Sequence, residues 1–287
     1  MSAVESESAN VTAFLKKLPA LIEEAEYDEL FGYQLDSKGD FYDENIARIL
    51  LAKYLKANNG SLSEAETQLL NTLKWRAEFK PLLAAFSETH PTKFSELGVL
   101  TVDNAAAADE KIITWNLYGK MDDVKEIFSK EGDKFLRWRV GLMEQAIQLL
   151  KFDDPDNDYM VQVHDYKGVS MLRIDPDIRK VTKAIIHTFS SHYPEIMSRK
   201  FFVNVPSIMS WCYSVAKTFA SPESRKKFMM ISNGAGLASE LGKTIPSEYG
   251  GKAGNLLSKQ FVFNDSKSQV SPYAAYIIQQ QISNELD

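Results

Sequence analysis

Two different spacings of hydrophobic and polar residues divide the chain. Up to about Phe94 the apolar residues recur every three to four positions, which predicts amphipathic helices. In Glu44–Leu55 the apolar stripe consists of Ile46, Ile49, Leu50, Tyr54 and Leu55. Ser61 and Glu64 then have the spacing of a capping box, which predicts the start of another helix. The first part of the chain is therefore expected to be helical, apart from a disordered tail at residues 1–10.

After a hinge expected at Pro81–Phe94, short strands alternate with helices. Runs rich in Val, Ile, Phe and Tyr predict strands at Lys111–Tyr118, Tyr159–Met171, Phe201–Val205 and Lys227–Ser232. Helical spacing predicts helices at Asp133–Leu150, Asp177–Ser191, Pro206–Phe219 and Ser271–Leu286. Strands that alternate with helices form mostly parallel sheets, because the helices serve as crossovers. The predicted fold class is therefore α/β, with a helical N-terminal part.

The helix predicted at Pro206–Phe219 has apolar residues around nearly its whole circumference. They are Ile208, Met209, Trp211, Cys212, Tyr213, Val215, Ala216 and Phe219. A helix of this kind is either buried in a core or in contact with lipid. The spacing alone does not distinguish these two alternatives.

Composition excludes several classes of protein. The net charge of −6 argues against nucleic-acid binding, because phosphate contacts need a basic surface. The single cysteine, Cys212, excludes an internal disulfide and fits a reducing compartment. No apolar run approaches the roughly 20 residues that cross a bilayer, so we expect only peripheral membrane contact. The acidic, polar first ten residues do not have the pattern of a signal peptide.

Four segments resemble the CRAL-TRIO lipid-binding family and occur in its order. NTLKWRAEF (Asn71–Phe79) is similar to the end of the family's helical N-terminal module, and VHDYKGVS (Val163–Ser170) to its central strand and turn. HYPEIMSRKFFVNVP (His192–Pro206) resembles a Tyr-Pro-Glu helix end followed by a strand ending in Asn-x-Pro. TIPSEYGG (Thr244–Gly251) resembles the closing loop. The likeness covers roughly residues 40–265.

This resemblance implies a CRAL-TRIO domain in which a mostly parallel sheet floors a hydrophobic pocket closed by a gate helix. It places a helical module at residues 11–95, the ligand-binding domain at 96–265, and a C-terminal helix at 266–287 packed on that domain. The gate corresponds to Pro206–Phe219, which favours the lipid-facing alternative. A closer likeness, to fungal phosphatidylinositol transfer proteins and their haem-binding branch, is carried by YDELFGYQL (Tyr27–Leu35), TWNLYGK (Thr114–Lys120), RWRVGLMEQ (Arg137–Gln145) and YMVQVHDYKGVS (Tyr159–Ser170).

His164 and Tyr166 are the first candidates for chemistry. They are two residues apart on a predicted strand and therefore point to the same face, together with Gln162. A tyrosinate can serve as the axial ligand of ferric haem, and a neighbouring histidine can tune it. The residues alone favour a structural tyrosine whose hydroxyl finds a partner. The resemblance reverses this preference, because the related branch places its iron-binding tyrosine at this position.

Arg139 lies on the inward stripe of its predicted helix, so it needs an anionic partner. A propionate, a phosphate or an internal carboxylate would each suit its guanidinium. Tyr118 ends a predicted strand and Lys200 opens another, and both are ordinary surface residues unless they line the pocket mouth. The haem-binding resemblance implies that all three contact haem.

Glu195 and Lys227 form a third group of candidates, 32 residues apart, at the end of a helix and the start of a strand. A lysine supplies a point charge for phosphate, and a carboxylate accepts hydrogen bonds from ring hydroxyls. Residues alone favour a surface ion pair here. The resemblance to phosphatidylinositol transfer proteins implies instead that both bind the inositol phosphate headgroup, with Ser224 adding a hydroxyl.

Three functions therefore stay open. The chain is a phosphatidylinositol carrier, a protein that binds haem b in the same pocket, or a haem enzyme of the peroxidase type. The first two are compatible with each other. We expect no enzyme, because no distal His–Arg pair is identifiable in the sequence. We also expect a cytoplasmic protein that associates peripherally with the endoplasmic reticulum or other membranes, and the oligomeric state stays undetermined.

Overall fold

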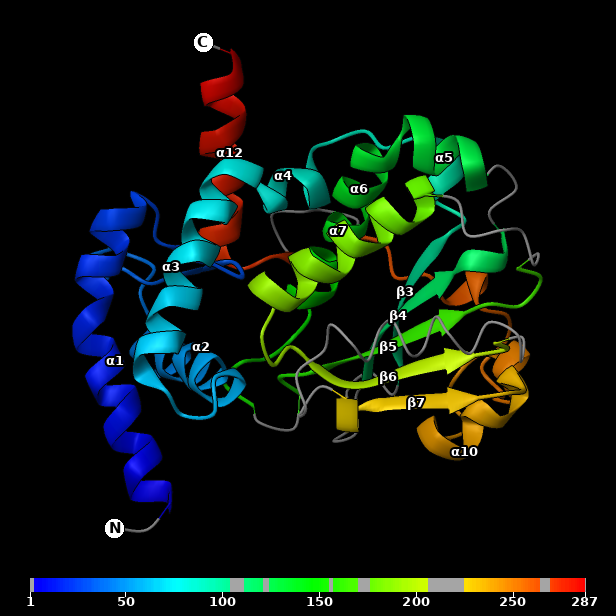
Figure 1. Ribbon diagram of the computed structural model, residues 1–287, viewed down its shortest axis with the longest axis horizontal. Helices are drawn as coiled ribbons and strands as arrows, with labels where there is room; N and C mark the ends of the chain where they lie inside the picture. The colour runs from blue at the N-terminus through cyan, green and yellow to red at the C-terminus, as the bar shows by residue number, and fades with distance from the viewer. Residues whose placement is uncertain are drawn as a thin grey trace.

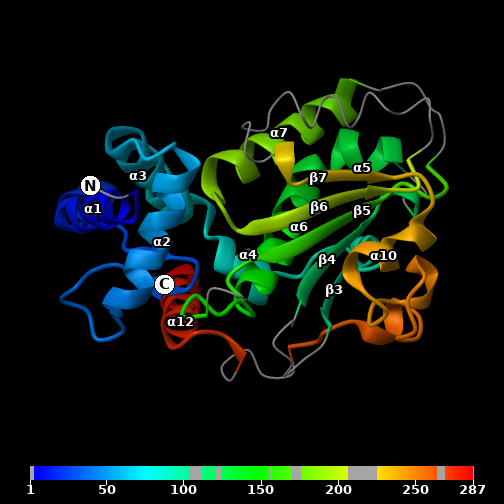
Figure 2. The same cartoon turned by 90° about the horizontal axis from the view of Figure 1, so that it is seen from below.

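The structure is a computed structural model that describes residues 3–103, 111–120, 124–154, 157–169, 176–205, 225–263 and 269–286. It consists of a helical N-terminal unit standing beside a unit built on a five-stranded sheet (Figures 1 and 2). This arrangement confirms the predicted fold class.

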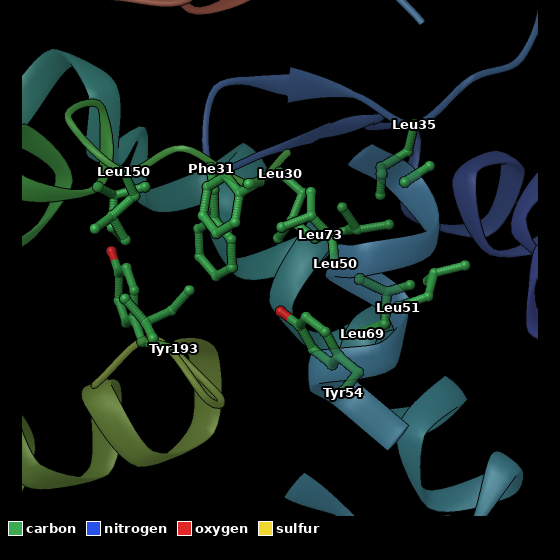
Figure 3. Close-up of a cluster of buried hydrophobic side chains, with 14 of the residues drawn as sticks. Leu30, Phe31, Leu35, Leu50, Leu51, Tyr54, Leu69, Leu73, Leu150 and Tyr193 are labelled. Carbon is green, nitrogen blue, oxygen red and sulfur yellow. The ribbon is translucent and has the colours of Figure 1, made fainter. Parts of the chain in front are cut away.

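The N-terminal unit contains α1 (Ala3–Ala25), α2 (Glu44–Ala57), α3 (Leu62–Phe79) and α4 (Pro81–Phe86), with a small pair of strands, β1 (Glu29–Leu30) and β2 (Tyr33–Gln34). The Asp43 side chain accepts hydrogen bonds from the first turn of α2, and Ser61 accepts one from Glu64 N at the start of α3. The predicted helix start at Ser61 is thereby confirmed. Side chains from α2 and α3 meet in the core shown in Figure 3, which includes Leu50, Leu51, Leu69 and Leu73.

Two expectations about this unit need correction. Residues 3–10 are not a disordered tail, because α1 already begins at Ala3. The buried residues Val11, Phe14 and Leu18 anchor the helix, and the Ala- and Glu-containing turns before them continue it. The segment Pro81–Phe94 is not a simple hinge, because its first six residues form the buried helix α4, which packs on α6.

The sheet has the strand order β3-β4-β5-β6-β7. Its strands are β3 (Gly98–Asp103), β4 (Lys111–Leu117), β5 (Met160–Asp165), β6 (Met197–Val203) and β7 (Phe228–Ile231). Strand β3 is antiparallel to β4, and the other neighbours are parallel. Strand β3 was not predicted, and the strand predicted at Tyr159–Met171 already ends at Asp165. Strand β6 starts at Met197, four residues before the predicted start at Phe201.

Helices α5 (Val124–Lys130), α6 (Gly132–Ile147) and α7 (Pro176–His192) lie on one side of the sheet, and the short α10 (Ala238–Leu241) lies on the other (Figure 1). Helix α12 (Pro272–Leu286) packs on α4 and on the β1–β2 pair, which belong to the helical unit and not to the ligand-binding domain on which it was expected to pack. Short 3-10 turns are found at Thr92–Phe94 (η1), Tyr118–Lys120 (η2), Gly234–Leu237 (η4), Ser247–Tyr249 (η5) and Leu257–Lys259 (η6). Among the described helices, none has the length and hydropathy needed to cross a membrane.

The two faces of the sheet differ in chemistry. The face toward α10 is apolar, with Trp115, Val163 and Phe201 packed on Leu237 and Tyr249. The face toward α6 carries polar groups in the middle of three adjacent strands. Because side chains alternate along a strand, the difference between the faces follows from the alternation of polar and apolar residues in each strand.

Candidate functional site

A polar stripe crosses the face of the sheet that looks toward α6. Asn116 on β4 pairs with His164 on β5, and Gln162 on β5 pairs with Lys200 on β6. All four side chains therefore point to the same face, as predicted for Gln162 and His164. Lys200 lies in the middle of β6 rather than at its start, which corrects the expectation that it opens a strand.

Arg139 reaches this stripe from α6. Its helical neighbours Phe135, Leu142 and Met143 are buried, which confirms the predicted inward stripe. The Arg139 Nη1 donates a hydrogen bond to Asn116 Oδ1, and the narrow space beside it is also lined by Thr114 and Gln162.

Arg139 is 4% exposed, and no carboxylate contacts its guanidinium within the described residues. Its Nε has no hydrogen-bond partner. Burial lowers the pKa of Arg139, and the electrostatic contributions of Tyr118 and Tyr166 only partly oppose this. A buried cation with an unsatisfied donor is costly, so this side chain is suited to an anionic ligand. The alternative of an internal salt bridge is not found among the described residues.

Aromatic rings surround His164. The ring centroid of Tyr118 lies 5.6 Å from that of His164 and 5.2 Å from that of Tyr166, and Phe202 lies 5.6 Å from His164 on the opposite side. His164 Nε2 is buried and lacks a hydrogen-bond partner. Burial lowers the pKa of His164 well below its usual value, and the charges of Lys200 and Arg139 lower it further. The imidazole is therefore neutral at physiological pH.

Lys200 adds a second basic group to the same face. Its ammonium lies 5.9 Å from the centre of the Phe202 ring and 5.7 Å from that of Phe228. Burial and the charge of Arg139 lower the pKa of Lys200 to about 7. The structure thus brings together Tyr118, Arg139, His164, Tyr166 and Lys200. These residues offer a phenol, an imidazole nitrogen, two basic groups and flat aromatic surfaces to one ligand.

The predicted pair of Glu195 and Lys227 is present. Lys227 Nζ lies 2.9 Å from Glu195 Oε2, and Lys56 Nζ of α2 lies 3.1 Å from the same oxygen. Burial raises the pKa of Glu195, but the hydrogen bonds and charges of Lys227 and Lys56 outweigh this, and the pKa is lowered overall. Glu195 also has φ +52°, which is a left-handed backbone conformation that residues other than glycine rarely adopt. Backbone strain of this kind is typical of functional positions.

Sequence reasoning missed Lys53, which contacts the backbone of Glu195. Its ammonium forms a 2.7 Å ion pair with Asp158 and donates a hydrogen bond of 3.1 Å to the carbonyl oxygen of Glu195. It lies 3.5 Å from the centre of the Tyr159 ring. Burial lowers the pKa of Lys53 to about 8, although Asp158 and Glu195 oppose the shift. Its place three residues after Leu50, on the apolar stripe of α2, was the available signal.

Other predictions lie outside the described residues. These are the hydroxyl of Ser224, the thiol of Cys212 and the apolar helix at Pro206–Phe219. Within the part of the chain that is described, no group of three or more His, Cys, Asp or Glu side chains could hold a metal ion.

Comparison with known proteins places these features in context. The profile of the CRAL/TRIO domain matches residues 108–251. The protein named phosphatidylinositol transfer protein SFH5 from Kluyveromyces lactis is 45% identical over 263 residues, which cover 91% of this chain and 85% of that protein. Its counterpart from Saccharomyces cerevisiae is 42% identical over 294 residues, covering 99% and 98%. The crystal structure of Sfh5 superposes with a TM-score of 0.90 at 40% identity and covers 99% of both chains.

Proposed function

The chain belongs to the CRAL/TRIO domain family, and from this premise we propose that it is a phosphatidylinositol transfer protein. The names of its relatives support lipid transfer as the activity. The observation that carries the assignment is the ion pair between the partly buried Lys227 and the buried Glu195, which has a strained backbone. Transfer breaks no covalent bond, so the proposal includes no catalytic residue.

In this proposal the inositol phosphate headgroup is held between α2 and the start of β7. Lys227 and Lys56 contribute positive charge for the phosphate, and the Glu195 carboxylate accepts hydrogen bonds from ring hydroxyls. Lys53 holds the backbone of Glu195 in place by its hydrogen bond to the carbonyl oxygen. The protein would act in the cytoplasm and contact the endoplasmic reticulum or other membranes peripherally while exchanging lipid.

The test is phosphatidylinositol transfer between vesicles by Lys227→Ala. Loss of a charge-assisted hydrogen bond typically costs about 1.5–3 kcal/mol, so transfer should fall more than about tenfold. Lys183→Ala removes an exposed lysine of α7 and serves as the charge-matched control, with transfer unchanged. Equal transfer by both variants would remove Lys227 from the headgroup site.

We further propose haem b as a ligand of the polar sheet face. The support is chemical fit: a buried guanidinium with an unpartnered Nε, a second basic group at Lys200, and an unpartnered imidazole nitrogen at His164 beside Tyr166. Tyr166 would supply a phenolate ligand to the haem iron and His164 would tune it, while Arg139, Lys200 and Tyr118 would contact the propionates. Bound haem would supply ferric iron at this face of the sheet.

A further inference from the structure

A second polar cavity lies at the opposite edge of the sheet from Lys227. Strand β7, which follows Lys227, is one edge strand, and β3 is the other. At the end of β3 a cavity of about 390 Å³ is lined by Val102, Asp103, Lys243, Thr244, Lys252, Ala253 and Lys259. This volume is in the range of small-molecule sites. The lining residues are distinct from those of the two sites described above.

The loop after α10 holds two of the lysines side by side. Lys252 N donates a hydrogen bond of 2.8 Å to the Lys243 carbonyl, and Ala253 N donates one of 3.3 Å to the Ile245 carbonyl. A Cβ on Gly251 would lie 1.7 Å from the backbone oxygen of Ile245, so only glycine at this position allows the two sides of the loop to come this close. The third lysine, Lys259, closes the 3-10 turn η6, which packs on β3.

The charges of the cavity are unbalanced. Three lysines face one carboxylate, and Lys252 and Lys259 form no ion pair within the described residues. Lys243 Nζ donates only a 3.3 Å hydrogen bond, to the carbonyl oxygen of Gly250. Asp103 is 5% exposed, and its buried Oδ2 has no hydrogen-bond partner. The buried Thr244 hydroxyl also lacks a partner.

Buried polar atoms are nearly always hydrogen-bonded, so two unpartnered atoms on residues that line one cavity point to a polar ligand there. The excess of lysines over carboxylates in the lining favours an anionic ligand. Burial raises the pKa of Asp103 to about 6, against the opposing charges of Lys111 and Lys259, so the carboxylate is mostly ionised at neutral pH. An ionised carboxylate accepts hydrogen bonds and repels a bare anion. The ligand must therefore carry hydroxyl donors as well as negative charge.

We propose that this cavity binds a small phosphorylated polyol. The ammonium groups of Lys243, Lys252 and Lys259 neutralise the phosphate, Asp103 accepts from a ligand hydroxyl, and the Thr244 hydroxyl makes a further hydrogen bond. The same chemistry is offered by a free polyol phosphate and by the headgroup of an inositol lipid.

Titration calorimetry with myo-inositol 1-phosphate, inorganic phosphate and myo-inositol tests the site. The Lys227→Ala variant is the starting protein, so that the Glu195–Lys227 site does not contribute. The polyol phosphate should bind at least about tenfold more tightly than either fragment, because only it satisfies both the lysines and Asp103. Lys252→Gln should weaken it by about threefold or more, whereas Lys16→Gln, an exposed lysine of α1, should change nothing.

Asp103→Asn distinguishes a built site from a simple basic patch. It should weaken the polyol phosphate relative to inorganic phosphate, because it replaces one acceptor oxygen by an amide donor, whereas the loss of the like charge favours both phosphates alike. Equal effects on both probes, or polyol phosphate binding that Lys252→Gln leaves intact, would overturn the proposal.

Vesicles separate the two sources of the ligand. Sedimentation with phosphatidylinositol vesicles is compared with phosphatidylcholine vesicles for the starting protein and its Lys252→Gln derivative. A lipid source predicts that Lys252→Gln reduces binding to the phosphatidylinositol vesicles alone. A free metabolite predicts that vesicle binding is unchanged while calorimetric binding is lost. No binding of the polyol phosphate and no dependence of vesicle binding on Lys252 would exclude both.

Discussion

Arg76 on α3 and Glu144 on α6 form a completely buried ion pair with two hydrogen bonds, of 2.7 Å from Nη1 to Oε1 and 3.1 Å from Nη2 to Oε2. The other edge of the guanidinium binds Glu29 in the same way, at 3.0 and 2.8 Å. Tyr193, which follows α7, donates a 2.6 Å hydrogen bond to Glu144. Burial lowers the pKa of Arg76, but the two carboxylates outweigh this and raise the pKa overall, so the guanidinium stays charged. These contacts join the helical unit to the sheet unit.

Replacing this arginine should destabilise the whole protein. Arg76→Met leaves the carboxylates of Glu29 and Glu144 buried without a cation, which should lower the free energy of unfolding by about 3–5 kcal/mol. Urea denaturation followed by circular dichroism measures the change. Lys74→Met is the control, because its ion pair with Glu24 is exposed and should cost less than about 1 kcal/mol. A loss at Arg76 no larger than at Lys74 would contradict a joining role.

Haem binding is expected to depend on one oxygen atom. Tyr166→Phe removes the phenolate but keeps the ring that lies 5.2 Å from Tyr118, so the fold should survive. Haem content and the Soret band after reconstitution should fall sharply. Tyr276→Phe, at an exposed tyrosine of α12, is the matched control and should retain the band because it removes no group from the haem site. A full and unaltered spectrum for Tyr166→Phe would show that another residue ligates the iron.

The titration of Lys200 should make the unliganded protein more stable as the pH rises, because the buried charge is lost. Its pKa of about 7 lies below the ordinary lysine value, so the folded state releases a proton that the unfolded state still holds. The destabilisation is fully present below pH 7 and fades as the pH rises toward about 10.5. Lys200→Met should therefore stabilise the protein more at pH 6.5 than at pH 9.5, by at least about 1 kcal/mol. Urea denaturation at both values measures this, and equal effects would mean that Lys200 is not desolvated.

Helix α4 should be sensitive to the size of residue 141. A Cβ on Gly141 would lie 2.5 Å from the Ala84 carbonyl oxygen, because α4 and α6 approach closely there. Gly141→Ala should lower the free energy of unfolding by about 1–3 kcal/mol. Gly236→Ala is the control, since its nearest neighbour would be at 3.4 Å and its backbone needs no positive φ. If Gly141→Ala proved neutral, α4 would not be packed as described and the segment would behave as a hinge.

The sequence by itself determined the local structure and part of the candidate site. The apolar stripe of Glu44–Leu55, the capping residue Ser61 and the inward stripe of Arg139 all follow from helical spacing, which involves neighbours three or four positions apart. Strand alternation likewise placed His164 and Gln162 on one face. These features depend on short stretches of chain, and each was predicted and then found.

Only the tertiary structure decided which distant residues meet. The sequence did not show that Lys53 holds the backbone of Glu195, that Arg76 lies between Glu29 and Glu144, or that three lysines gather around Asp103. It also missed β3, an edge strand, and placed Lys200 at the start of β6. Such contacts form between segments far apart in the chain, and their positions depend on how whole helices and strands pack. For Lys53 and Arg76, the packing that buries the charge also brings it a carboxylate, so these pairs follow only from the tertiary structure.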